Sequence, residues 1–177
     1  MPQANPKTTR VDPYKNFRFR VKFGDGDYIA GISKVTGFTR TTEVVKHRSG
    51  GDPSLSYKLP GRTDYEAITL ERGVTLDPEF EKWANKVWSF RNAAGGVETS
   101  LKDFRRDLLI DVFDDGGRKV LSYELHKAWV SEYKPLSDLD GNANAVLIQS
   151  IKLEHEGWVR DDSVVVPADN SFDDPTG

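Results

Sequence analysis

The chain has 177 residues, enough for one domain with a real core, and its 37% hydrophobic content is low without being that of a wholly disordered chain. A formal net charge of -3 argues against general attraction to nucleic acid or an anionic membrane, and no apolar stretch is long enough to cross a bilayer. The absence of cysteine excludes disulfides and thiolate chemistry. Because the N-terminus has no apolar signal core, we expect the protein to be made and folded in the cytoplasm.

The two ends of the chain differ in composition from its middle. Residues 1–12 are polar and contain proline, whereas residues 161–177 contain five aspartates and no basic residue. We therefore expect a flexible N-terminal extension over 1–12, one domain over 13–160 and a mobile acidic tail over 161–177.

Alternating apolar and basic residues mark the first predicted strand, over 16–23. In a strand this alternation places the apolar side chains on one face and the basic side chains on the other. A second strand over 28–35 follows the turn signal Gly24-Asp-Gly-Asp27, so we expect the two strands to pair as a hairpin. The basic face is interpreted as an exposed or subunit-facing edge, with a nucleic-acid surface as the alternative.

The next segment has β propensity but little apolar patterning. A strand is predicted over 39–47, where charged residues occur on both faces, so it buries little within its own subunit. Residues 48–62 contain Gly-Gly, Pro and Pro-Gly and are predicted to form a long loop or an extended hairpin. Long ordered connections of this kind are usually functional.

One helix is predicted, beginning at Asp77-Pro78-Glu79. Aspartate favours the N-cap, proline the first helical position and glutamate the positive end of the helix. Apolar residues recur at helical spacing over 80–90, and Gly95-Gly96 ends the pattern. The helical residues expected to fill the core are Phe80, Trp83, Val87 and Trp88.

The remaining predicted elements are strands, so the fold class is mainly β with one helix. A strand is predicted over 65–74, and strands over 108–113 and 120–131 are expected to pair as a hairpin. In the last strand, over 146–158, the phase of the apolar residues shifts, which predicts a bulge near Gln149.

No group of residues predicts an active site. The three histidines, His47, His126 and His155, lie on different predicted elements without metal-ligand spacing. The stretch from Asp138 to Asn142 differs from a calcium loop in the position of its glycine, so it is interpreted as a turn. We therefore expect no catalytic residue, no cofactor and no metal ligand.

Several sequence motifs occur in a recognisable order within residues 12–160. They are Asp12-Pro-Tyr-Lys-Asn-Phe-Arg-Phe-Arg-Val, Ser33-Lys-Val-Thr-Gly-Phe38, Lys58-Leu-Pro-Gly-Arg62, Ile68-Thr-Leu-Glu-Arg-Gly73 and Leu153-Glu-His-Glu-Gly-Trp158. In this order they resemble the inner tail tube proteins of contractile phages and phage-like contractile injection systems, to which the tube protein of type VI secretion is related.

The resemblance implies a two-sheet β-barrel or sandwich with one flanking helix and an extended loop that reaches neighbouring subunits. It implies homohexameric rings stacked into a hollow tube, which passes effector or DNA cargo inside a contractile sheath. The spike hub or baseplate and the tail terminator are the further partners implied, with assembly in the bacterial cytoplasm and no stable membrane association of the chain itself. The loop residues expected to contact other subunits are Lys46, Arg48, Tyr57, Lys58, Leu59 and Arg62.

Two alternatives stay open at this point. An adaptor ring between the spike hub and the tube would have the same fold and a different position in the particle. A monomeric β-barrel that binds a small ligand or acts as an enzyme would have a similar strand pattern.

Overall fold

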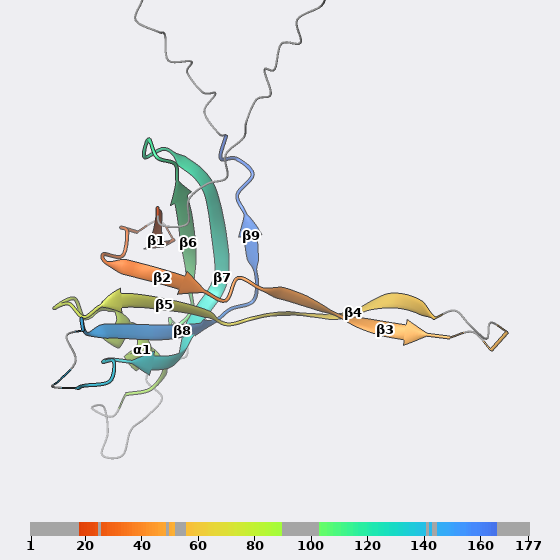
Figure 1. Ribbon diagram of the computed structural model, residues 1–177, viewed down its shortest axis with the longest axis horizontal. Helices are drawn as coiled ribbons and strands as arrows, with labels where there is room; N and C mark the ends of the chain where they lie inside the picture. Colours follow the sequence, from red (N-terminus) through yellow and green to blue (C-terminus); the bar gives the residue numbers. More distant parts are fainter. Residues whose placement is uncertain are drawn as a thin grey trace, which may run out of the picture.

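The computed structural model describes residues 18–24, 26–48, 50–51, 56–89, 103–140, 142 and 145–165 (Figure 1). The elements in chain order are β1 (Phe19–Phe23), β2 (Ile32–Thr36), β3 (Arg40–His47), β4 (Tyr57–Tyr65), β5 (Ile68–Gly73), α1 (Glu79–Val87), β6 (Arg106–Phe113), β7 (Lys119–Lys134), β8 (Ile148–Glu154) and β9 (Trp158–Arg160). The mainly β fold with one helix is confirmed for these residues. The predicted extension over 1–12 and most of the predicted tail over 161–177 lie outside them.

The body of the protein is a seven-stranded antiparallel sheet folded into two layers. The strand order is β1-β6-β7-β8-β5-β2, and β9 also pairs with β7. The first part of β7 pairs with β6 and β9, whereas its last part pairs with β8. The long strand β7 therefore bends from one layer into the other (Figure 1).

The bend in β7 contains a β-bulge at Lys127. This residue has a φ of 52°, the only positive value of a non-glycine residue in the described part of the chain. The pairing register with β6 shifts between Arg106 and Leu108, opposite this point, and such bulges bend a strand and increase its twist. The Lys127 amide donates to Asp107 Oδ1 at 2.7 Å, so the group left without a ladder partner is satisfied.

The hydrophobic core lies between the two layers and is closed by α1. Its fully buried apolar residues include Val21, Ile68, Leu70, Phe80, Trp83, Leu108, Leu125, Ile151 and Leu153. In β1, Phe19, Val21 and Phe23 all face this core, while Arg20 is exposed. The alternation predicted for the first strand is confirmed.

The predicted pairing of the first two strands is wrong. Strand β1 pairs with β6, and β2 pairs with β5 in the other layer. Between the two strands there is an isolated bridge from Lys22 to Tyr28. After this bridge Gly31, with a φ of 76°, turns the chain toward the second layer. Because β1 and β2 are the two ends of the strand order, the sheet folds over without closing into a barrel.

The last predicted strand, over 146–158, is interrupted. It forms β8 and β9, and the break contains Gly157, whose φ is 139°. The predicted bulge near Gln149 is wrong, because Gln149 lies in phase with the buried residues of β8 and is itself buried. The register shift lies on the partner strand, between Val130 and Glu132 of β7.

The helix begins one residue later than predicted, and its apolar stripe is shorter. Phe80 and Trp83 are fully buried and Val87 is partly buried. Assigning Trp88 to the core was wrong: it follows the helix with extended backbone and is 52% exposed, because the helix ends at Val87. The rest of the predicted stripe, up to residue 90, lies outside the described residues. No helix in the described part of the chain has the length and apolarity needed to span a membrane.

A buried arginine joins the start of α1 to the sheet. Arg72 of β5 is fully buried, with its guanidinium 4.1 Å from the centroid of the Phe80 ring. Its Nη1 and Nη2 donate to Asp77 Oδ2 and to the Asp77 carbonyl, each at 2.7 Å, and Nε donates at 2.7 Å to the Gln149 amide oxygen in the orientation that satisfies both groups. Asp77 Oδ1 also accepts the Glu79 amide at 3.0 Å, which satisfies one amide at the start of the helix. The hydrogen bond from Arg72 lowers the pKa of Asp77 below its ordinary value.

Candidate assembly site

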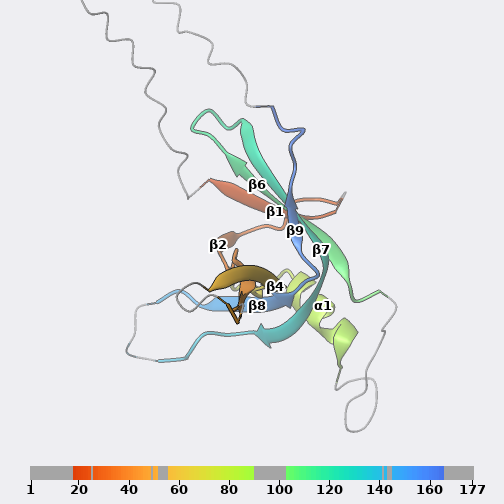
Figure 2. The same ribbon diagram turned by 90° about the vertical axis from the view of Figure 1, so that its right-hand side faces the viewer.

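An arm projects from the body along the long axis of the molecule (Figure 1). It consists of β3 and β4, which form a two-stranded sheet of their own. All eight residues of β3 and seven of the nine residues of β4 are exposed. Figure 2, turned by 90°, looks toward the arm and shows the body behind it. A two-stranded hairpin is marginally stable in water, so the arm gains little stability from its own subunit.

The two faces of the arm tip differ in chemistry. Val45 pairs with Leu59, and Tyr57 lies two residues from Leu59 on the same face. Between 46% and 52% of each of these three side chains is exposed. On the other face Lys46 lies directly opposite Lys58. Like charges placed opposite each other destabilise a strand pair, and neither lysine has an ion pair among the described residues.

The middle of the arm contains a β-bulge. Thr42 pairs with Thr63 and Val44 with Pro60, so two residues of β4, Gly61 and Arg62, lie opposite the single residue Glu43 of β3. Proline has no amide hydrogen to donate to the ladder, and a Cβ on Gly61 would lie 3.0 Å from Val45 Cγ2. The Pro-Gly motif noted in the sequence therefore fits a twisted hairpin and not a long irregular loop.

The structure places the loop residues predicted to contact other subunits on the arm or directly beside it. They are Lys46, Tyr57, Lys58, Leu59 and Arg62, within the two strands, and Arg48, just after β3. Their exposure leaves them accessible to another chain. Contact with another subunit remains a prediction for each of them.

The arm joins the body through an aromatic cluster. Phe38 lies two residues before the start of β3, and Tyr65 is the last residue of β4. The Trp158 ring lies between them, with centroid distances of 5.9 Å to Phe38 and 6.0 Å to Tyr65. Tyr123 of β7 lies 5.7 Å from both Phe38 and Trp158, and the Arg40 guanidinium lies 6.0 Å from the Trp158 centroid. These contacts fix the bases of both arm strands on the body.

Two glycines permit close backbone approach at this root of the arm. Gly37 has a φ of 100°, and a Cβ there would lie 2.2 Å from the carbonyl oxygen of Ala67. Gly157 has a φ of 139°, and a Cβ there would lie 3.3 Å from the Tyr65 ring. Both glycines belong to motifs singled out in the sequence, so the two motifs share a structural role: they hold the arm on the body.

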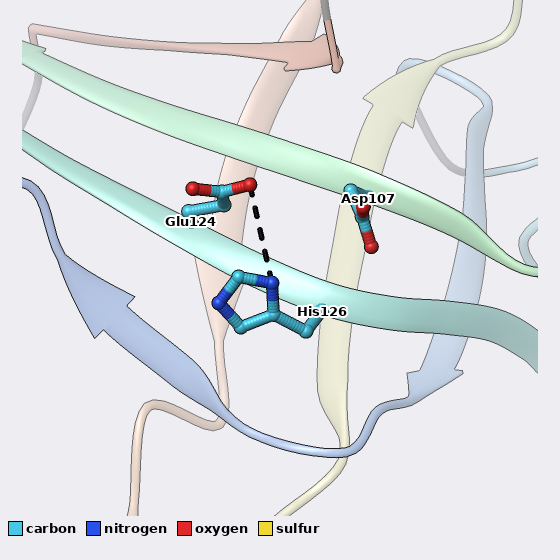
Figure 3. A group of neighbouring side chains, drawn as sticks. All are labelled: Asp107, Glu124 and His126. Carbon is cyan, nitrogen blue, oxygen red and sulfur yellow. Dashed lines mark ion pairs between the residues drawn. The ribbon is translucent and has the colours of Figure 1, made fainter.

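A separate cluster on β6 and β7 contains Asp107, Glu124 and His126 (Figure 3). Their potential ligand atoms all lie within 4.8 Å of one another, and His126 Nδ1 is 3.9 Å from Glu124 Oε1. Carboxylate and imidazole donors suit Zn²⁺, but bonds of about 2.0–2.2 Å require the donors to lie closer together than this. No spacing in the sequence marks this cluster, because it is the bulge at Lys127 that brings His126 toward Asp107.

Residues 15–159 match the model of the family described as T4-like virus tail tube protein gp19. The chain belongs to this tail tube protein family. The matched region contains the arm, its aromatic root and α1. As a tail tube protein the chain is a structural subunit of the inner tube, and the family resemblance noted in the sequence is confirmed.

Solved structures of contractile injection particles contain chains of the same fold. A chain in the PVC sheath–tube complex of an extracellular contractile injection system, in the extended state, matches with a TM-score of 0.69 and 21% identity over 90% of this chain and 99% of that chain. A chain in the PVC sheath/tube terminator structure matches with a TM-score of 0.71 and 21% identity over 85% of this chain and 98% of that chain. A chain in the tube-terminating cap of the anti-feeding prophage matches with a TM-score of 0.69 and 19% identity over 89% of this chain and 99% of that chain. No match is found among curated protein sequences.

Proposed function

We propose that the chain builds the inner tube of a contractile tail or contractile injection system, as homohexameric rings that stack around a central lumen. Family membership supports the tube, and the shared fold with chains of sheath–tube, cap and terminator structures supports the contractile context. The observation that carries the assembly is the arm, an exposed hairpin that its own subunit cannot bury.

The arm supplies the contacts between subunits in this proposal. Tyr57 and Leu59 lose water when the arm packs on a neighbour, and burial of apolar surface favours association by about 25 cal/mol for each Å². Lys46, Lys58 and Arg62 meet carboxylates across the interface. Since the arm orders fully only against a neighbour, subunits remain soluble until a ring forms.

The rest of the particle follows from the same proposal. The contractile sheath surrounds the tube, the spike hub or baseplate starts it, and a terminator ends it. The lumen passes effector or DNA, and the particle is assembled in the bacterial cytoplasm. The role is mechanical and requires no catalytic residue.

The proposal is tested by removing the arm without disturbing the body. Residues 44–61 are replaced by a short Gly/Ser turn that preserves the inner pair of Thr42 with Thr63. Circular dichroism and thermal unfolding report the fold, and sedimentation with negative-stain electron microscopy reports assembly.

We expect hexameric rings or tubes from the wild type, and a folded, unassembled variant. A wild type that stays monomeric at high concentration, even beside its hub and sheath partners, contradicts the proposal. Normal tubes from the variant without the arm show that the contact lies elsewhere on the body.

A further inference from the structure

A shallow pocket lies where β7 leads into β8, with a volume of about 250 Å³. Its described lining residues are Ser137, Asp138, Leu139, Asp140, Ala145, Val146 and Leu147. Figure 1 places the start of β8 at the opposite end of the long axis from the arm. The end pocket and the arm therefore lie at opposite ends of one subunit.

The end pocket combines apolar side chains with carboxylates. Leu139 and Val146 are 72% and 79% exposed, unusually high values for apolar residues that line one depression. The Asp138 side chain is 99% exposed, and its Oδ1 lies 3.4 Å from Lys134 Nζ. Asp140 lies two residues further along the same wall. The pocket therefore offers apolar surface bordered by two carboxylates, one of which has Lys134 as a neighbour.

The apolar surface extends beyond the end pocket onto the β5–α1 connection. The amide of Val74 donates to the Leu147 carbonyl at 2.9 Å, which joins this connection to the pocket wall. Leu76, two residues beyond Val74, is fully exposed. A leucine held in water gains about 1.5–3 kcal/mol on burial, so this end of the body favours an apolar partner.

We propose that the end pocket of one subunit binds the arm tip of a second copy of the chain. The inference rests on the tube proposed above and assigns the surface that receives the arm. Leu59 and Val45 supply an apolar face that can cover the exposed Leu139 and Val146 of the pocket. Lys46 and Lys58, on the opposite face of the same tip, supply positive charges that match Asp138 and Asp140 at the border of the pocket.

The charge pattern also explains why the arm binds a pocket and not another arm. Lys46 and Lys58 repel each other within one arm, and two arms brought together would place four such lysines side by side. Exposed strand edges commonly use lysine to prevent edge-to-edge pairing. A carboxylate-lined pocket removes the repulsion and so selects the correct contact.

The placement of the two surfaces determines the kind of assembly. Each copy offers one arm and one end pocket, and the two lie at opposite ends of the body (Figure 1). Such a head-to-tail contact is heterologous, and it generates closed rings or open helical stacks. Both outcomes are compatible with the proposed tube.

The test reverses the charges on each surface separately. One variant carries Lys46→Glu and Lys58→Glu, and the other carries Asp138→Lys and Asp140→Lys. All four side chains are exposed, so thermal unfolding should stay near that of the wild type. Lys82→Glu changes an exposed lysine of α1 that belongs neither to the arm nor to the described pocket lining, and it is the control for a change of net charge.

We expect each reversed variant to raise the concentration needed for assembly at least about tenfold, because like charges then meet across the contact. A mixture of the two reversed variants should assemble again, since each negative arm can bind a positive pocket and each positive arm a negative pocket. A chain that carries all four changes should also assemble. The Lys82→Glu control should assemble like the wild type.

The outcomes separate this inference from the proposed function. If the wild type forms tubes and both reversed variants do so at the same concentration, the end pocket is not the arm's binding site, while the tube proposal stands. Loss of assembly in both variants without recovery in the mixture or the fourfold variant also overturns the pairing, and assigns the charges to another partner. A wild type that never assembles contradicts the tube proposal itself.

Discussion

Replacing Trp83 by alanine should destabilise the subunit strongly. Trp83 is fully buried on α1, and its ring meets Phe23 edge-on at a centroid distance of 5.2 Å. Its Nε1 donates to the Phe104 carbonyl at 2.7 Å, and the Arg106 guanidinium lies 5.7 Å from the ring. The substitution therefore removes an aromatic side chain from the core and leaves a carbonyl without its donor.

The expected loss is about 3–5 kcal/mol, the usual range when a buried aromatic side chain is truncated to alanine. For a protein of this size each kcal/mol lowers the melting temperature by about 2–4 °C, so the melting temperature should fall by about 6–20 °C. Trp83→Phe keeps most of the ring and loses the hydrogen bond to Phe104, so it should cost about 1–2 kcal/mol.

Thermal unfolding followed by near-ultraviolet circular dichroism measures both losses, and Trp88→Ala provides a matched control. Trp88 is 52% exposed beyond the end of the helix, so its truncation should cost about 1 kcal/mol or less. If Trp83→Ala lowers the melting temperature no more than Trp88→Ala does, α1 is not packed on the core as described.

Three further predictions follow from other contacts. Gly37→Ala adds a Cβ 2.2 Å from the Ala67 carbonyl oxygen, so it should lower the free energy of unfolding by about 1–3 kcal/mol and impair assembly. An unchanged melting temperature together with normal tubes would contradict this. Asp77→Asn keeps an oxygen that can accept the Glu79 amide but removes the charge paired with Arg72. It should cost about 1–2 kcal/mol at pH 7, less than the loss of a fully buried pair because Asp77 is partly exposed. Since the pKa of Asp77 is lowered in the folded protein, its ionised form stabilises the fold fully above the unfolded-state pKa near 3.9, and this stabilisation is lost as the pH falls below that value. Denaturant unfolding should therefore show the difference in unfolding free energy between wild type and Asp77→Asn shrinking between pH 7 and pH 3. A difference that stays constant would refute the pairing of Asp77 with Arg72. His126→Gln, and excess chelator added to the wild type, should leave assembly unchanged on negative-stain grids, whereas stoichiometric metal retained by the wild type and lost by the variant would show a cation site.

The sequence predicted best what neighbouring residues determine. The alternation in β1 is a local property of the chain, and so is the turn between β6 and β7. The pairing of β1 was predicted incorrectly because the next apolar segment follows a strong turn signal. What separates the two strands is Gly31, whose positive φ becomes visible only in the fold.

The buried charge of Arg72 could not be predicted from its own neighbourhood. An arginine in a strand is expected to face solvent. Its burial depends on Asp77 at the helix start and on Gln149 of β8, which is distant in sequence. Gln149 itself was interpreted as a sign of a bulge, because a polar residue on the buried face resembles a break in the apolar pattern.

The arm was predicted more fully than the body, for a physical reason. A strand with charged residues on both faces cannot be buried by its own subunit, whatever the rest of the fold does. The sequence could not predict which groups hold the arm in place. Phe38, Tyr65 and Trp158 come from three separate segments and meet only when the layers of the sheet have formed.

The most direct test of the account is a cryo-electron microscopy map of particles assembled from the wild-type chain, at a resolution that traces the backbone. We expect stacked hexameric rings around an open lumen, with the arm of β3 and β4 packed on a neighbouring copy. Particles without rings, or rings in which every arm projects into solvent without touching another copy, would contradict it.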